Sequence, residues 1–101
     1  MPDQLTSGLL VSLEAKEGKQ DEIAALLNGA LAAVTREGDT ATWYAYRITE
    51  TEFGIFDTFY DDSARDAHLS GEVAQAIERI SDLLLDEPPR IERIDILASK
   101  Q

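Results

Sequence analysis

Apolar residues recur with two different periods along this chain, and the changes of period divide it into strands and helices. Period-two alternation and runs of aromatic and β-branched residues indicate strands. Four such strands are predicted, over residues 9–15, 42–49, 53–60 and 90–98. Only the polar residues Glu50, Thr51 and Glu52 separate the two middle strands, which predicts an antiparallel hairpin.

The first predicted helix lies between Gly18, which opens it, and Gly38, which ends it. Apolar residues recur there every three or four positions and form one stripe on an otherwise polar helix. The stripe comprises Ile23, Leu26, Leu27, Ala30, Leu31 and Val34.

The second predicted helical region follows the third strand, where Asp61, Asp62 and Ser63 offer side-chain oxygens as N-caps. Gly71 interrupts this region, and Ser70 is expected to cap the continuation. The helix ends before Pro88 and Pro89, because proline cannot donate a helical hydrogen bond. Its apolar stripe comprises Val73, Ala76, Ile77, Ile80 and Leu84.

The order β-α-β-β-α-β over 101 residues, without a linker or repeat, predicts one α+β domain spanning residues 1–101. Two split βαβ units of this length form a ferredoxin-like sandwich. We therefore expect a four-stranded antiparallel sheet with both helices on one face.

The predicted strands carry apolar residues on both faces, although two helices can cover only one. In the second strand, Tyr44 and Tyr46 lie on one face, and Trp43 and Ala45 lie on the other. The third and fourth strands likewise carry apolar residues on both faces. Monomers rarely expose so large an apolar patch. We therefore expect a homodimer in which two sheets pack face to face around a two-fold axis.

Composition excludes several classes of function. The net charge is −11, from 20 acidic and 9 basic residues, which disfavours binding to nucleic acids or anionic membranes. No apolar run is long enough to span a membrane, and the first residues do not resemble a secretory signal. Cysteine is absent, which excludes disulfides and thiolate chemistry and makes the cytoplasm the expected compartment. No phosphate-binding loop or dinucleotide motif is present, so we expect no cofactor.

Most of the chain resembles the antibiotic biosynthesis monooxygenase family of dimeric α+β barrels. The resemblance rests on LLVSLEAKEGKQDEIAALL, WYAYRI, FGIFDTFYDDSARDAHLSG and EPPRIERIDILASK. The most specific part is the string Ala67-His68-Leu69, followed by Gly71 after one variable position. It implies a ferredoxin-like dimer that oxidises a quinol-like or phenolic aromatic molecule with dioxygen and without a cofactor. A non-catalytic dimer that binds a hydrophobic small molecule is the alternative, since fold kinship does not settle function.

Haem-degrading relatives suggest a third function, because His68 lies about where they carry an axial ligand. Those relatives also use an asparagine on the first strand and a tryptophan at the end of the third. Here the corresponding positions hold Ser12 and the pair Phe59-Tyr60, so the haem constellation is incomplete.

His68, the only histidine, is the first candidate for proton transfer, since imidazole titrates near neutrality. A lone histidine on a half-buried helix can also simply hydrogen-bond a neighbour. Asp57, in the middle of an apolar strand, is the second candidate catalytic group, because burial makes a carboxylate a better base. The competing interpretation, which we favour for Asp57, is an ion pair with Arg47 or Arg93.

Four residues are predicted to bind the substrate: Trp43, Arg47, Phe59 and Tyr60. Arg47 can stabilise a developing oxyanion, and the aromatic rings suit a flat substrate, although each ring can equally be core packing. No metal site is predicted. Asp61, Asp62 and Asp66 lie near His68, but the first two are expected to cap a helix, and one histidine with scattered carboxylates binds transition metals poorly.

Overall fold

The computed structural model describes residues 5–100, which form one antiparallel sheet and three helices. The strands are β1 (Ser7–Glu14), β2 (Thr42–Arg47), β3 (Glu52–Phe59) and β4 (Arg90–Asp95). Their order in the sheet is β2-β3-β1-β4. The predicted hairpin of β2 and β3 is confirmed by their antiparallel register.

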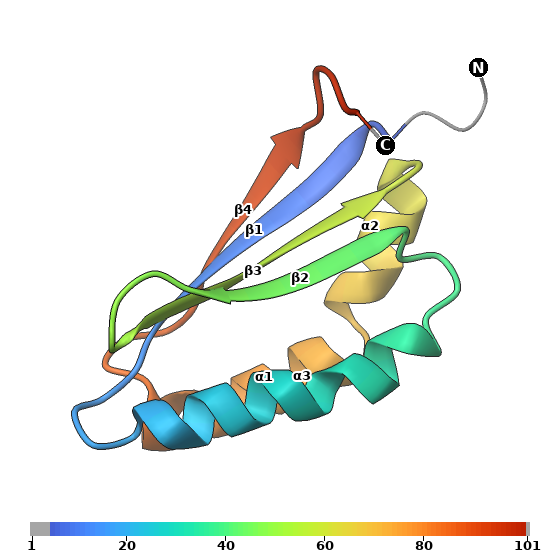
Figure 1. The fold of residues 1–101 in the computed structure, drawn as a ribbon. Helices are drawn as coiled ribbons and strands as arrows, with labels where there is room; N and C mark the ends of the chain where they lie inside the picture. The colour runs from blue at the N-terminus through green and yellow to red at the C-terminus, as the bar shows by residue number, and fades with distance from the viewer. Residues whose placement is uncertain (1–4, 101) are drawn as a thin grey trace.

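The helices are α1 (Gln20–Thr35), α2 (Asp62–Leu69) and α3 (Glu72–Leu84). Helices α1 and α3 run side by side below the sheet, and α2 descends from the end of β3 to meet them (Figure 1). The ferredoxin-like α+β fold is thus confirmed, with the second helical region split into two helices. Within the described residues, no helix has the length and apolar character needed to cross a membrane.

The sheet face toward the helices carries the core. Leu9, Val11 and Leu13 of β1 are buried there, and the register places them opposite Asp57, Ile55 and Phe53 of β3. Because side chains alternate along a strand, these positions all point to the same side. Asp57 is therefore the one charged member of an otherwise apolar row of β3.

The other sheet face also carries apolar side chains, as the strand pattern predicted. Tyr44 of β2 and Phe56 of β3 are opposed in register, and their rings stack with centroids 6.4 Å apart. Tyr44 remains 58% exposed. No helix of the described chain covers this face (Figure 1). We call it the open face.

Several local boundaries differ from the predictions, and β1, β2 and β3 begin or end one or two residues away from the predicted ranges. Helix α1 begins at Gln20, because Gly18 adopts φ +86° and forms the preceding turn. The N-cap of α3 is Gly71 and not Ser70, whose hydroxyl donates to the Ala67 carbonyl at the end of α2. Strand β4 ends at Asp95, where its pairing with β1 ends.

Candidate functional site

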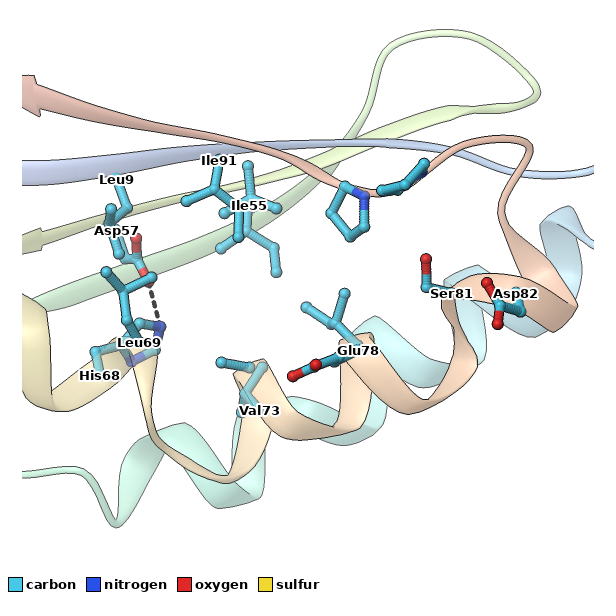
Figure 2. A pocket seen from close by; sticks show the side chains of 15 residues that line it. Leu9, Ile55, Asp57, His68, Leu69, Val73, Glu78, Ser81, Asp82 and Ile91 are labelled. Carbon is cyan, nitrogen blue, oxygen red and sulfur yellow. Dashed lines mark ion pairs between the residues drawn. The ribbon is translucent and has the colours of Figure 1, made fainter.

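A cavity of about 460 Å³ lies between the sheet and α3. Three strands contribute apolar side chains to its roof, and α3 forms its floor (Figure 2). His68 and Asp57 form one end of the cavity, while Glu78, Ser81 and Asp82 line it along α3. The apolar wall comprises Leu9, Val11, Ile55, Leu69, Val73, Ala74, Ile77, Pro88, Pro89 and Ile91. The size and lining suit a small, mostly apolar ligand.

Helix α2 positions the imidazole at this end. The Asp61 side chain accepts a hydrogen bond from the Ala64 amide at 2.8 Å, which confirms the predicted N-cap. Buried Arg65 donates to the carbonyls of Gly8 at 3.3 Å and Ile94 at 3.1 Å, and so ties α2 to β1 and β4. His68 follows one turn after Ala64 and Arg65 and therefore faces the sheet.

His68 lies between two carboxylates. Its Nε2 is 2.8 Å from Oδ2 of Asp57, and its Nδ1 is 2.6 Å from Oε1 of Glu37. The Thr40 hydroxyl also lies 3.3 Å from Nδ1. The Phe59 ring packs against the imidazole with centroids 5.3 Å apart. The two carboxylates and the Phe59 ring thus fix the position and orientation of the imidazole.

These neighbours change the pKa of His68. Burial lowers it, since a charged imidazolium is poorly solvated in the interior, but the carboxylates of Asp57 and then Glu37 raise it, because each stabilises the charged imidazolium beside it. The carboxylates together prevail, so the pKa of His68 lies above its ordinary value of 6.5. Near neutrality the imidazolium form is favoured more than in a free histidine.

Asp57 is buried without full hydrogen bonding. Its side chain has no exposed surface, and neither carboxylate oxygen has a well-aligned hydrogen bond from the described residues. The 2.8 Å contact with His68 is therefore chiefly ionic. A buried carboxylate with open acceptor positions can accept a proton or a hydrogen bond from a ligand hydroxyl, provided that the ligand or side chain shifts to meet it.

The interpretation of Asp57 as the partner of an arginine was wrong. Arg93 pairs with Asp66 at 2.9 Å. Arg47 donates to the Glu50 carbonyl at 3.1 Å and lies over the Phe53 ring, at the opposite end of β3 from Asp57. The helix α2 brings His68 to Asp57 instead, a contact across the fold that strand pattern alone could not indicate.

The four residues predicted to bind substrate do not line this cavity. Trp43 is directly opposite Asp57 in the β2–β3 register, but its ring packs against the core beside α1. Arg47 lies beside α1 in a separate hollow. Phe59 is fully buried and contacts the His68 ring, so it positions the imidazole. Tyr60 is 47% exposed, and its carbonyl accepts from the Thr6 hydroxyl.

The acidic residues near His68 have other partners. Asp61 caps α2, Asp62 accepts from Ser7 at 2.6 Å and pairs with Arg65, and Asp66 pairs with Arg93. In the part of the chain that the structure describes, no group of three or more acidic or histidine side chains is arranged to hold a metal ion.

Haem does not fit this site. Both ring nitrogens of His68 already face carboxylates, so an axial bond to iron would displace one of them. Ser12 is exposed, and its place in the strand alternation turns it away from the helix-facing row of Leu9, Val11 and Leu13. The donors that would bind and orient haem are therefore not assembled around the cavity.

Glu37 is the functional candidate that the sequence pattern missed. It lies just beyond α1, in the segment leading to β2, and its side chain is 22% exposed. It is 31 residues from His68 in the chain, so no local motif links the two. Only the packing of the α1–β2 connection against α2 brings them together.

No protein-family model matches the chain, and no curated protein matches it. Solved structures do match the chain. The NE2512 protein of unknown function from Nitrosomonas europaea is 38% identical, with a TM-score of 0.93, and the match covers 96% of this chain and 94% of that one.

Two further structures, both provisionally named antibiotic biosynthesis monooxygenases, share the fold. The protein from Caulobacter crescentus CB15 is 17% identical, with a TM-score of 0.79 and coverage of 94% of this chain and 92% of that one. The protein from Nitrosomonas europaea is 13% identical, with a TM-score of 0.80 and coverage of 91% and 90%. The resemblance in fold predicted from the sequence is thus confirmed. The chain belongs to one family with the NE2512 protein, and that family has the antibiotic biosynthesis monooxygenase-like fold.

Proposed function

We propose that this protein is a homodimeric, cofactor-independent monooxygenase that oxidises a quinol-like or phenolic aromatic molecule with dioxygen. The observation that carries the proposal is an apolar cavity that ends on the His68–Asp57 pair. The names of two proteins that share its fold support the reaction class. Oxygenation without a cofactor needs a dry cavity and a group that removes a phenolic proton, because the resulting anion reacts with dioxygen.

The proposed chemistry assigns different roles to the two side chains. Asp57 accepts the proton of a substrate hydroxyl, and the His68 imidazolium stabilises the aromatic anion that remains. One atom of dioxygen enters the substrate as a carbonyl oxygen, and the other leaves as water. The substrate supplies all the electrons that dioxygen takes up, so the protein needs no redox group of its own.

The dimer is proposed from the open face. Stacked Tyr44 and Phe56 lie there with half-buried Leu10, Tyr46 and Ile94, and a second copy of the sheet is the partner that matches this flat, apolar surface. Sheets packed in this way lie about 10 Å apart, and the facing side chains are buried between them. The two cavities then lie on the outer, helix-covered sides of the joined sheets.

Binding without catalysis is the second candidate function. It is favoured by one observation, namely that Asp57 has no exposed surface even though it lies in the cavity wall. A ligand that never reaches this carboxylate would be held by the apolar wall alone. The two functions differ in whether proton removal follows binding.

Oxygen uptake over a panel of reduced naphthoquinols and polycyclic phenols tests the proposal. The wild type is compared with His68→Ala, with Leu83→Ala on the exposed side of α3 as matched control, and with a blank, since quinols autoxidise. We expect uptake above the blank in the wild type and control, and a loss of about 100-fold or more in His68→Ala. Uptake equal in all three proteins would remove His68 from the mechanism.

Fluorescence of Trp43, the only tryptophan, follows binding in the same samples. Quenching by a quinol that the wild type does not oxidise would favour the binding protein over the enzyme. Quenching together with uptake supports the enzyme. The pair of measurements thus separates failure to bind from failure to react.

A further inference from the structure

His68 lies between two hollows. One is the apolar cavity, and the other is a smaller opening lined by Arg36, Glu37, Asp39, Thr40 and Glu72, among others. Asp57 belongs to the lining of the first, and Glu37 to that of the second. The imidazole therefore lines both hollows, with Asp57 on the side of the first and Glu37 on the side of the second.

Exposure increases along the three side chains. The exposed fraction is 0% for Asp57, 8% for His68 and 22% for Glu37, and the two joining distances are 2.8 Å and 2.6 Å. The first distance is typical of a charge-assisted N–H···O contact, and the second is slightly shorter than such contacts usually are. The three groups thus form a continuous line from the cavity wall toward solvent.

We infer that Asp57, His68 and Glu37 form a proton path, with Glu37 as the outlet through which the cavity exchanges protons with solvent. The inference rests on the proposed function, for which it supplies the fate of the substrate proton. Glu37 does not touch the substrate and acts on it only through His68, so it is a positioning residue for the chemistry.

The proton transfers balance over one reaction. The substrate hydroxyl proton moves to Asp57, which removes the counter-charge of the His68 imidazolium. The imidazolium then releases its Nδ1 proton to Glu37, which passes it to water, while Nε2 keeps its own proton. One proton therefore leaves the cavity for each anion formed. When the second oxygen atom leaves the substrate as water, it takes the proton from Asp57, and Nδ1 regains a proton from water through Glu37, which restores the starting state. No electrons move in these proton transfers.

Other ionisable groups lie around the path without joining it. Glu78 and Asp82 of α3 line the cavity, and Arg36 pairs with Glu72 at 3.2 Å in the outer opening. None of the four has an ion pair or hydrogen bond to His68 in the described structure. Thr40 shares Nδ1 with Glu37, but its hydroxyl does not supply a base near neutrality.

Proton exchange at the ring nitrogens of His68 tests the path without any substrate. Because His68 is the only histidine, ¹⁵N-histidine labelling gives one imidazole signal to follow by NMR. The wild type is compared with Glu37→Gln, which keeps the side-chain shape but cannot accept a proton as a carboxylate does. Asp39→Asn, in the same outer opening, is the matched control. Each protein is measured at the same interval below its own His68 titration midpoint.

We expect exchange of the Nδ1 proton with water to slow by at least about tenfold in Glu37→Gln, in line with the loss of a general base. Asp39→Asn should exchange like the wild type. Glu37→Asp, which keeps the charge but draws it back from Nδ1, should lie between them and serves as the second variant. Equal exchange in the wild type and Glu37→Gln would overturn the path.

This result is independent of the oxygen-uptake experiment. Slow exchange in Glu37→Gln with no uptake on any quinol would support the path and count against the proposed reaction. Normal exchange with uptake that depends on His68 would support the enzyme and reject Glu37 as the outlet. The two failures therefore have different signatures.

Discussion

Asp57 has His68 as its ionic partner, with Oδ2 of the carboxylate 2.8 Å from Nε2 of the imidazole, in the interior between the sheet and α2. The carboxylate is fully buried and the imidazole nearly so. A buried charge whose partner is lost is costly, because no water replaces the partner. This contact therefore links the stability of the fold to the chemistry of the cavity.

Removal of His68 alone should destabilise the protein strongly. In His68→Leu, Asp57 stays buried without its counter-charge, for which we expect a loss of about 3–5 kcal/mol in the free energy of unfolding. The double variant His68→Leu/Asp57→Leu should recover part of this loss, since it leaves no unpaired charge. Urea unfolding of both variants measures the difference, and equal losses would argue against the ion pair.

Stability should depend on pH through His68. Because the pKa of His68 is raised in the folded state, the folded protein holds this proton more tightly than the unfolded chain. The stabilisation is complete below the ordinary value of 6.5 and is lost as pH rises through the folded-state pKa. We expect the free energy of unfolding to fall across this range in the wild type.

His68→Gln supplies the control for that pH dependence. Groups that do not contact His68 contribute equally to both proteins, so the difference between their urea-unfolding curves isolates the histidine together with its two carboxylate partners. The difference should shrink as pH rises above the folded-state pKa. A difference that stays constant with pH would show that the histidine proton is not linked to folding.

Asp57→Asn should lower the pKa of His68 more than Glu37→Gln does. Among the interactions that raise this pKa, those with Asp57 outweigh those with Glu37, while burial acts in the opposite direction. NMR titration of the single imidazole measures both shifts directly. A larger shift in Glu37→Gln would reverse the assigned strengths of the two partners.

The open face should decide the oligomeric state. Tyr44→Glu places a charge within the proposed sheet-to-sheet contact, so we expect it to convert a dimer to a monomer. Leu83→Glu changes an apolar residue on α3 that is even more exposed than Tyr44, and it should leave the dimer intact. Sedimentation velocity of the three proteins gives the answer, and a monomeric wild type would remove the proposal.

Gly54 should not tolerate a side chain. A Cβ at this position would overlap the Tyr46 ring and lie 2.7 Å from the Val11 carbonyl oxygen, and the backbone of a central strand cannot move away cheaply. We expect Gly54→Ala to destabilise the protein by about 1–3 kcal/mol. Gly29→Ala, in open space on α1, should instead stabilise it by about 0.5–1 kcal/mol. Thermal unfolding of both variants compares the two glycines.

The order of strands and helices could be read from the sequence because local patterns carry it. The alternation of Leu9, Val11 and Leu13 marks the buried face of β1, and the Asp61 cap marks the start of α2. Burial of one face and capping of one helix end depend on residues close together in the chain. Periodicity and capping residues are therefore sufficient to predict these parts of the fold.

The partners of the site could not be predicted in this way. The sequence pointed to His68 and Asp57 separately, but it paired Asp57 with an arginine and gave no role to Glu37. The lining of the cavity, including Val73 and Ile91, likewise comes from elements that meet only after folding. Which charges pair depends on distances across the interior, and these distances are set by how α2 and the α1–β2 connection pack against the sheet. Local sequence thus specifies the elements and the candidate proton carriers, whereas long-range packing selects the groups that lie next to them.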